Sequence, residues 1–179
     1  CTGYRPIIDA AKSLNKKRDN DEFVKFKKKT INLFKKIKIK NIEIKKENKK
    51  YFAPNTILEL KKVLKKNPDA KLLSGGTDLS LEVTKSRKEI KKIISLNSIK
   101  ELDFINNKKN EIEVGAGTSL LKFEKIIKKY YPDFNSILKR YGSVQIRNVG
   151  TIAGNIATAS PIGDTLPLLL SLDAKIILD

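Results

Sequence analysis

The chain has 179 residues, 40% of them hydrophobic, and a formal net charge of +18, which is enough apolar material for one medium-sized domain with a core. The absence of His excludes Ser-His-Asp catalysis, Cys-His catalysis and His-ligated zinc. The single Cys excludes an internal disulfide and suits a reducing compartment. Any redox chemistry must therefore come from a bound cofactor.

The positive charge comes from Lys rather than Arg. Only five of the 38 basic residues are Arg, whereas nucleic-acid sites favour the bidentate Arg side chain. The most apolar stretch, Leu166 to Leu178, is interrupted by Asp173 and Lys175 and is too short to span a bilayer. We therefore expect a soluble cytoplasmic protein with no nucleic-acid partner and no membrane partner.

The two ends of the chain predict a fragment. There is no Met, and the chain begins at Cys1. It ends on an apolar run at residues 175–179 that is typical of a strand in the middle of a sheet. We expect residues 1–22 to be the end of one domain, with a helix that carries its apolar residues between Ile7 and Leu14.

Residues 23–50 are Lys-rich and predict a linker. From Ile37 to Ile44 the Ile residues recur at every second position, with one offset. An amphipathic basic segment for anionic lipid is the alternative. It is less favoured because the apolar face is thin.

Short helices and strands alternate from Tyr51 onward. Thr56 and Glu59 predict a capping box for a helix that stops at Asn67-Pro68. Strands are expected at 70–73, 90–96, 101–105 and 111–114, with a polar turn at 106–110. Further helices are expected after Thr118, which we predict as an N-cap, at 135–140, and after Asp164 or Thr165. This pattern predicts an α+β fold with a first lobe at 51–108 and a second, incomplete lobe at 109–179.

Two loops have the composition of phosphate-binding segments. In the first, a strand leads into two glycines and a hydroxyl, so that successive backbone N–H groups can face an anion. It consists of Leu72, Leu73, Ser74, Gly75, Gly76, Thr77, Asp78 and Leu79. The second, residues 150–160, is rich in small residues and lies in a stretch that contains no Lys. Either loop is also compatible with simple close packing, and Asp164 is also compatible with helix capping.

Together these segments resemble the molybdenum hydroxylases of the xanthine dehydrogenase type. Residues 1–7 look like the end of their ferredoxin-like domain, where Cys1 matches the last ligand of a [2Fe–2S] cluster and the other ligands would lie upstream. Residues 72–79 resemble their first FAD pyrophosphate loop. Residues 150–164 resemble the second loop, with its pattern G-x-x-x-G-N-x-x-x-A-S-P-x-x-D.

The resemblance implies a two-lobed FAD-binding domain of the PCMH (vanillyl-alcohol oxidase-like) type. Asp164 would bind the ribose or ribityl side of FAD, and Tyr141 matches an aromatic residue near the adenine or the flavin. The residues that would face the FAD phosphates are Thr151, Ile152, Ala153, Gly154 and Asn155.

The implied enzyme is an oxidoreductase in which this chain carries electrons. A molybdenum cofactor on a partner subunit would hydroxylate a purine, and iron–sulfur clusters would pass the electrons to FAD and then to NAD⁺ or oxygen. The full-length protein is expected to be a hetero-oligomer, with no acid–base catalyst in this chain. The alternatives are an FAD subunit of an aldehyde or carbon monoxide oxidoreductase and, from another class, a basic module that binds nucleic acid or membrane.

Overall fold

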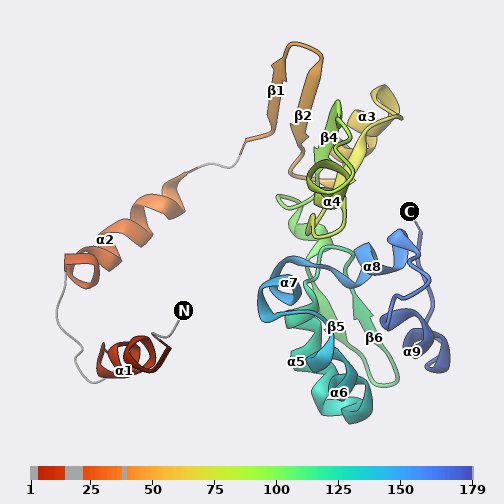
Figure 1. Ribbon diagram of the computed structural model, residues 1–179. Coiled ribbons are helices and arrows are strands. Elements are labelled where there is room, and N and C mark those ends of the chain that lie inside the picture. The colour runs from red at the N-terminus through yellow and green to blue at the C-terminus, as the bar shows by residue number, and fades with distance from the viewer. Residues whose placement is uncertain (1–3, 15–21, 38–39, 179) are drawn as a thin grey trace. The chain divides into compact units, whose positions relative to one another are not determined.

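The computed structural model describes residues 4–14, 22–37 and 40–178 (Figure 1). The chain divides into two compact units, Cys1–Ile39 and Lys40–Asp179. Cys1, the expected cluster ligand, lies outside the described residues.

Two helices make up the described part of the first unit. They are α1 (Tyr4–Leu14) and α2 (Glu22–Lys36), and neither contains a buried residue. The helix predicted from Ile7 to Leu14 is confirmed. Most of the predicted linker up to Lys36 is the helix α2, whose apolar residues recur at the helical period and favour a helix.

The second unit begins with a four-stranded sheet in the order β1-β2-β4-β3. Its strands are β1 (Ile42–Lys46), β2 (Lys49–Ala53), β3 (Lys71–Leu73) and β4 (Lys92–Ser95). β1 pairs antiparallel with β2, and β4 lies parallel to both β2 and β3. Since β1 is hydrogen-bonded into this sheet, residues 42–50 are not linker either.

Helix α3 (Ile57–Lys66) connects β2 to β3, and α4 (Leu79–Thr84) follows β3. The Thr56 hydroxyl accepts a hydrogen bond from the Glu59 amide at 3.2 Å, and the Glu59 carboxylate accepts one from the Asn55 amide at 3.0 Å. Asn67 is the C-cap. The predicted N-cap at Thr56 and the helix stop at Asn67 are therefore confirmed.

A second, two-stranded antiparallel sheet follows the first. It consists of β5 (Ile105–Asn107) and β6 (Ile112–Val114). The strand predicted over 101–105 is wrong for most of its length, because Lys100–Leu102 is a 3₁₀ turn, η1. The second sheet begins at Ile105, within the residues assigned to the first lobe. The predicted polar turn at 106–110 overlaps the turn between β5 and β6.

Five helices complete the second unit. They are α5 (Leu120–Tyr130), α6 (Pro132–Arg140), α7 (Val144–Val149), α8 (Ile152–Thr158) and α9 (Thr165–Ser171). The core of α5, α6 and α8 consists of Leu120, Phe123, Ile127, Phe134, Leu138 and Ile152. The strand expected at the end of the chain is wrong for residues 174–178, which have no ladder partner among the described strands.

The predicted cap of α5 is wrong by one residue. Ser119 is the N-cap, and its hydroxyl accepts a hydrogen bond from the Lys122 amide. Thr118 is fully buried instead, and its hydroxyl donates to the Phe104 carbonyl at 2.9 Å. Thr118 therefore ties the start of α5 to the segment before β5.

Thr118→Val is expected to lower the free energy of unfolding by about 1 kcal/mol, because it removes one buried hydrogen bond while keeping the side-chain shape. Chemical denaturation measures this. Thr84→Val is the matched control, because the Thr84 hydroxyl donates to the Ser80 carbonyl at 3.0 Å on an exposed surface. Equal losses of unfolding free energy in the two variants would contradict a stabilising role for the buried hydrogen bond between Thr118 and Phe104.

Candidate functional site

The first predicted loop lies between β3 and α4. Within the described part of the chain, the backbone N–H groups from Ser74 to Leu79 donate no hydrogen bond. Gly76 has a φ of +72°, which is a left-handed conformation that favours glycine. Successive unpaired N–H groups in such a turn form a concave site for an anion.

The second predicted loop is mostly helical, because α8 occupies Ile152–Thr158. Thr151 is the N-cap of α8, and its hydroxyl accepts a hydrogen bond from the Gly154 amide at 3.0 Å. The Ala153 amide donates to no group among the described residues. Ile152 faces the protein, because its side chain is in the core and its amide lies in the antiparallel bridge between Ser119 and Thr151.

The two loops meet backbone to backbone. A Cβ atom at Gly75 would lie 2.1 Å from the Val149 carbonyl oxygen and 2.7 Å from the Gly150 Cα atom. A Cβ atom at Gly150 would lie 3.7 Å from the Thr77 hydroxyl oxygen. The structure therefore brings together two segments that the sequence could only nominate separately.

Tyr141 connects the second loop to α9. Its hydroxyl oxygen accepts a hydrogen bond from the Asn155 side-chain amide at 3.0 Å, and the Thr165 hydroxyl donates to the other end of Asn155. Burial raises the pKa of Tyr141 above its usual range, and the negative charges of Asp164 and Asp78 raise it further. The Asn155 hydrogen bond acts in the opposite direction. Four predicted site residues therefore lie close together: Asp78, Tyr141, Asn155 and Asp164.

Asp164 has no capping role in this arrangement. It stands at the N-cap position of α9 but makes no side-chain capping bond. Its side chain is exposed, so its carboxylate is open to a ligand hydroxyl. This favours the binding interpretation of Asp164 over simple helix capping.

Asp164→Asn is expected to lower the pKa of Tyr141 towards its usual range, because one of the two negative charges that raise it is removed. The raised pKa of the folded state means that Tyr141 stabilises the fold at pH values below the ordinary tyrosine pKa. This stability is lost as the pH rises through the folded pKa. Ultraviolet titration of phenolate absorbance, with Tyr141→Phe as the subtraction reference, measures the shift. An unchanged titration in Asp164→Asn would contradict the proximity of this carboxylate.

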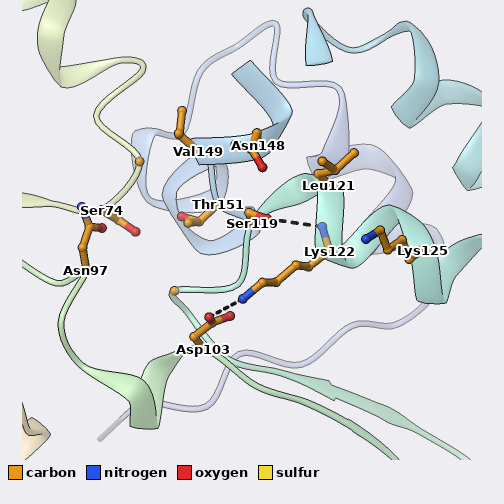
Figure 2. A pocket seen from close by; sticks show the side chains of 12 residues that line it. Ser74, Asn97, Asp103, Ser119, Leu121, Lys122, Lys125, Asn148, Val149 and Thr151 are labelled. Atoms are coloured by element: carbon orange, nitrogen blue, oxygen red, sulfur yellow. Dashed lines mark hydrogen bonds and ion pairs between the residues drawn. The ribbon is translucent and has the colours of Figure 1, made fainter. Parts of the chain in front are cut away.

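A cavity of about 420 Å³ adjoins both loops (Figure 2). Of the predicted residues, it is lined by Ser74, Gly75 and Thr151. The Lys122 ammonium donates to the Asp103 carboxylate, and Lys125 has no ion pair or hydrogen bond among the described residues. The lining residues that the sequence did not nominate are Asn97, Asp103, Gly117, Ser119, Leu121, Lys122, Lys125, Asn148 and Val149.

The remaining predicted residues lie away from this cavity. Leu72 and Leu73 end β3, and Leu79 begins α4. Tyr141, Asn155 and Asp164 form the neighbourhood described above. Among the residues that the structure describes, no cluster of three or more His, Cys, Asp or Glu could hold a metal ion.

The sequence of residues 38–179 matches the family model described as the FAD binding domain in molybdopterin dehydrogenase. The nicotinate dehydrogenase FAD-subunit of Eubacterium barkeri is 33% identical over 133 residues, which cover 72% of this chain and 45% of that protein. The xanthine dehydrogenase of Emericella nidulans is 26% identical over 99% of this chain and 17% of that protein. The chain therefore spans less than half of the length of these relatives.

A solved structure of a Cu,Mo-CO dehydrogenase in its cyanide-inactivated form is also similar. It superposes with a TM-score of 0.61 at 27% sequence identity, covering 67% of this chain and 43% of that chain. The fold is thus that of a molybdenum hydroxylase flavoprotein component, as the loops predict. The chain belongs to the family of FAD-binding domains of molybdopterin dehydrogenases, which are parts of oxidoreductases.

Proposed function

We propose that the chain holds FAD where its two loops meet. The observation that carries the proposal is the row of unpartnered backbone N–H groups from Ser74 to Leu79, with that of Ala153 in the second loop. The diphosphate of FAD would accept hydrogen bonds from these groups. Buried or partly buried donors of this kind need a partner, and a phosphate oxygen supplies one without a Lys side chain.

The side chains around the loops fit the rest of the dinucleotide. The Asp164 carboxylate is free to accept a hydrogen bond from a ribose or ribityl hydroxyl. The aromatic ring of Tyr141, held by Asn155, offers a face to the adenine or the flavin. Gly75 and Gly154 allow the close packing around this site, because a Cβ atom at these positions would lie 2.1 Å from the Val149 carbonyl oxygen and 2.8 Å from the Thr151 hydroxyl oxygen, respectively.

The bound FAD would supply the electron-transfer chemistry, and this chain would place and tune it. We infer that the electrons come from a molybdenum cofactor on a partner subunit, through [2Fe–2S] clusters, and leave to NAD⁺. Cys1 would be the last ligand of one cluster, with the other ligands upstream. The alignment with the Emericella nidulans xanthine dehydrogenase, which covers 99% of this chain, supports this assignment.

Purine hydroxylation is the activity that we favour for the whole enzyme. The alternative is an aldehyde or carbon monoxide oxidoreductase, which the similarity to the Cu,Mo-CO dehydrogenase structure supports. The partner subunit decides between them, because the substrate reacts there.

Retained flavin tests the proposal. The purified chain is incubated with FAD or with FMN, freed of unbound flavin and assayed by absorbance and by chromatography after denaturation. We expect one FAD per chain and little FMN, because FMN lacks the diphosphate. Gly154→Val should lose FAD, because its Cβ would lie 2.8 Å from the hydroxyl oxygen of Thr151. Asn110→Val, on the exposed β5–β6 turn, should retain it. A chain that circular dichroism shows to be folded and that retains no flavin, or retains FMN equally well, would refute the proposal.

A further inference from the structure

Helix α2 lies outside residues 38–179, which the family model matches. Its first turn contains Glu22, and its remaining charged residues are lysines. No residue of α2 is buried, although it contains three Phe. Within the described part of the first unit, taken by itself, no other residue covers these apolar side chains.

These apolar side chains follow one face of the helix. Phe23, Phe26 and Phe34 recur at helical spacing, and Leu33 lies on the same face. Phe23 is 87% exposed and Phe34 is 66% exposed. The lysines of the opposite face are Lys25, Lys28, Lys29, Lys35 and Lys36. None of these lysines forms an ion pair with a carboxylate in the described part of the chain.

We propose that α2 lies flat on a lipid surface that carries anionic headgroups. The Phe stripe would enter the boundary between headgroups and acyl chains, and the lysines would remain among the phosphates. A strongly amphipathic helix with Phe or Leu on one face and Lys on the other is the arrangement that binds such a surface. Each lysine near the surface adds attraction that high salt weakens.

The helix would rest on the bilayer without crossing it. No helix among the described residues is long and apolar enough to span a membrane, and a surface helix needs no such length. The expectation of no membrane partner depended on the lack of a spanning run and on a thin apolar face. The helical conformation of residues 22–36 gathers the apolar residues into a wider face than an extended chain would.

Charge favours lipid over the other occupants of such a face. Nucleic acid offers anions but no apolar surface for a continuous Phe stripe, and an apolar protein groove would cover the Phe stripe without using the positive charge of the opposite face. An anionic bilayer meets both faces of α2 at once. It also has no shape to match, so a lone helix can bind it.

Vesicle sedimentation of the full chain tests the proposal, with phosphatidylcholine vesicles and with vesicles that also contain phosphatidylglycerol. Wild type should sediment with the anionic vesicles only. Replacing Phe23, Phe26 and Phe34 by Ser should reduce the partition coefficient at least about ten-fold. Lys28→Glu with Lys29→Glu should also weaken binding.

Two matched variants control for the high net charge of the chain. Lys62→Glu with Lys65→Glu makes the same charge change on the exposed side of α3, and Leu58→Ser removes an apolar side chain that is 63% exposed there. Both should bind vesicles like wild type. The proposal is overturned if the chain ignores anionic vesicles, if the Phe variant binds as well as wild type, or if the α3 charge variant loses as much binding as the α2 variant. FAD retention should be unchanged in every variant, so this test can fail without the flavin proposal failing.

Discussion

Gly75→Ala is expected to reduce FAD affinity at least about 100-fold, even though it adds a single methyl group. The new Cβ would lie 2.1 Å from the Val149 carbonyl oxygen and 2.6 Å from its carbon. The backbone of Gly75 and that of Val149 would have to move apart, so the N–H donors of the two loops would no longer converge on one diphosphate. Binding that depends on several aligned donors is lost when their geometry changes.

Ser74→Ala is the matched control for this loop. Position 74 already has a Cβ, and the substitution keeps the backbone amide that we propose as a donor. Its FAD affinity should stay within a few-fold of wild type. Equilibrium titration by flavin fluorescence compares the two variants, and circular dichroism checks that both are folded. If Ser74→Ala lost FAD and Gly75→Ala retained it, side-chain contacts rather than the backbone would hold the ligand.

Arg147→Met is expected to lower the free energy of unfolding by about 2–3 kcal/mol, because it leaves the partly buried Glu124 carboxylate and two backbone carbonyls without their donor. Arg147 is 7% exposed, and its guanidinium lies 3.2 Å from the Glu124 carboxylate. It also donates to the carbonyls of Tyr141 and Gly142, each at 2.9 Å. One side chain thus ties α5 and α7 to the turn that carries Tyr141.

Chemical denaturation measures this loss, and Arg140→Met is the control because Arg140 is exposed. We expect the control to change the free energy of unfolding by less than about 0.5 kcal/mol. Arg147→Lys should fall in between, because it keeps the charge but cannot reach Glu124 and two carbonyls together. A loss in Arg147→Met no larger than in the control would contradict this central role.

Local signals predicted the parts of the fold that local chemistry decides. The Thr56 capping box, the stop at Asn67 and the turn after β3 each depend on a few adjacent residues. The errors arose where distant residues decide. Leu102 was expected in a strand, but its carbonyl packs against Gly115 and its amide closes the 3₁₀ turn. In α2, abundant Lys concealed the apolar pattern, and in β1 the alternating Ile residues were visible but were assigned to a linker.

The candidate site shows the same division. Both loops stood out because Gly and small residues suit close backbone approach. The contact between Gly75 and Val149 could not be predicted, because it depends on how two sheets and five helices pack. The same holds for the cavity, where Asn97, Asp103 and Lys122 come from three separate segments. The local signals at its wall were Ser74, Gly75 and Thr151 of the two loops.

Hydrogen–deuterium exchange with and without FAD tests the central claim most directly. The amides from Ser74 to Leu79 and that of Ala153 have no partner in the described chain. They should exchange rapidly without ligand and become protected together when FAD binds, while the exposed β5–β6 turn stays unchanged. If FAD bound and these amides exchanged as fast as before, the two loops would not be the diphosphate site.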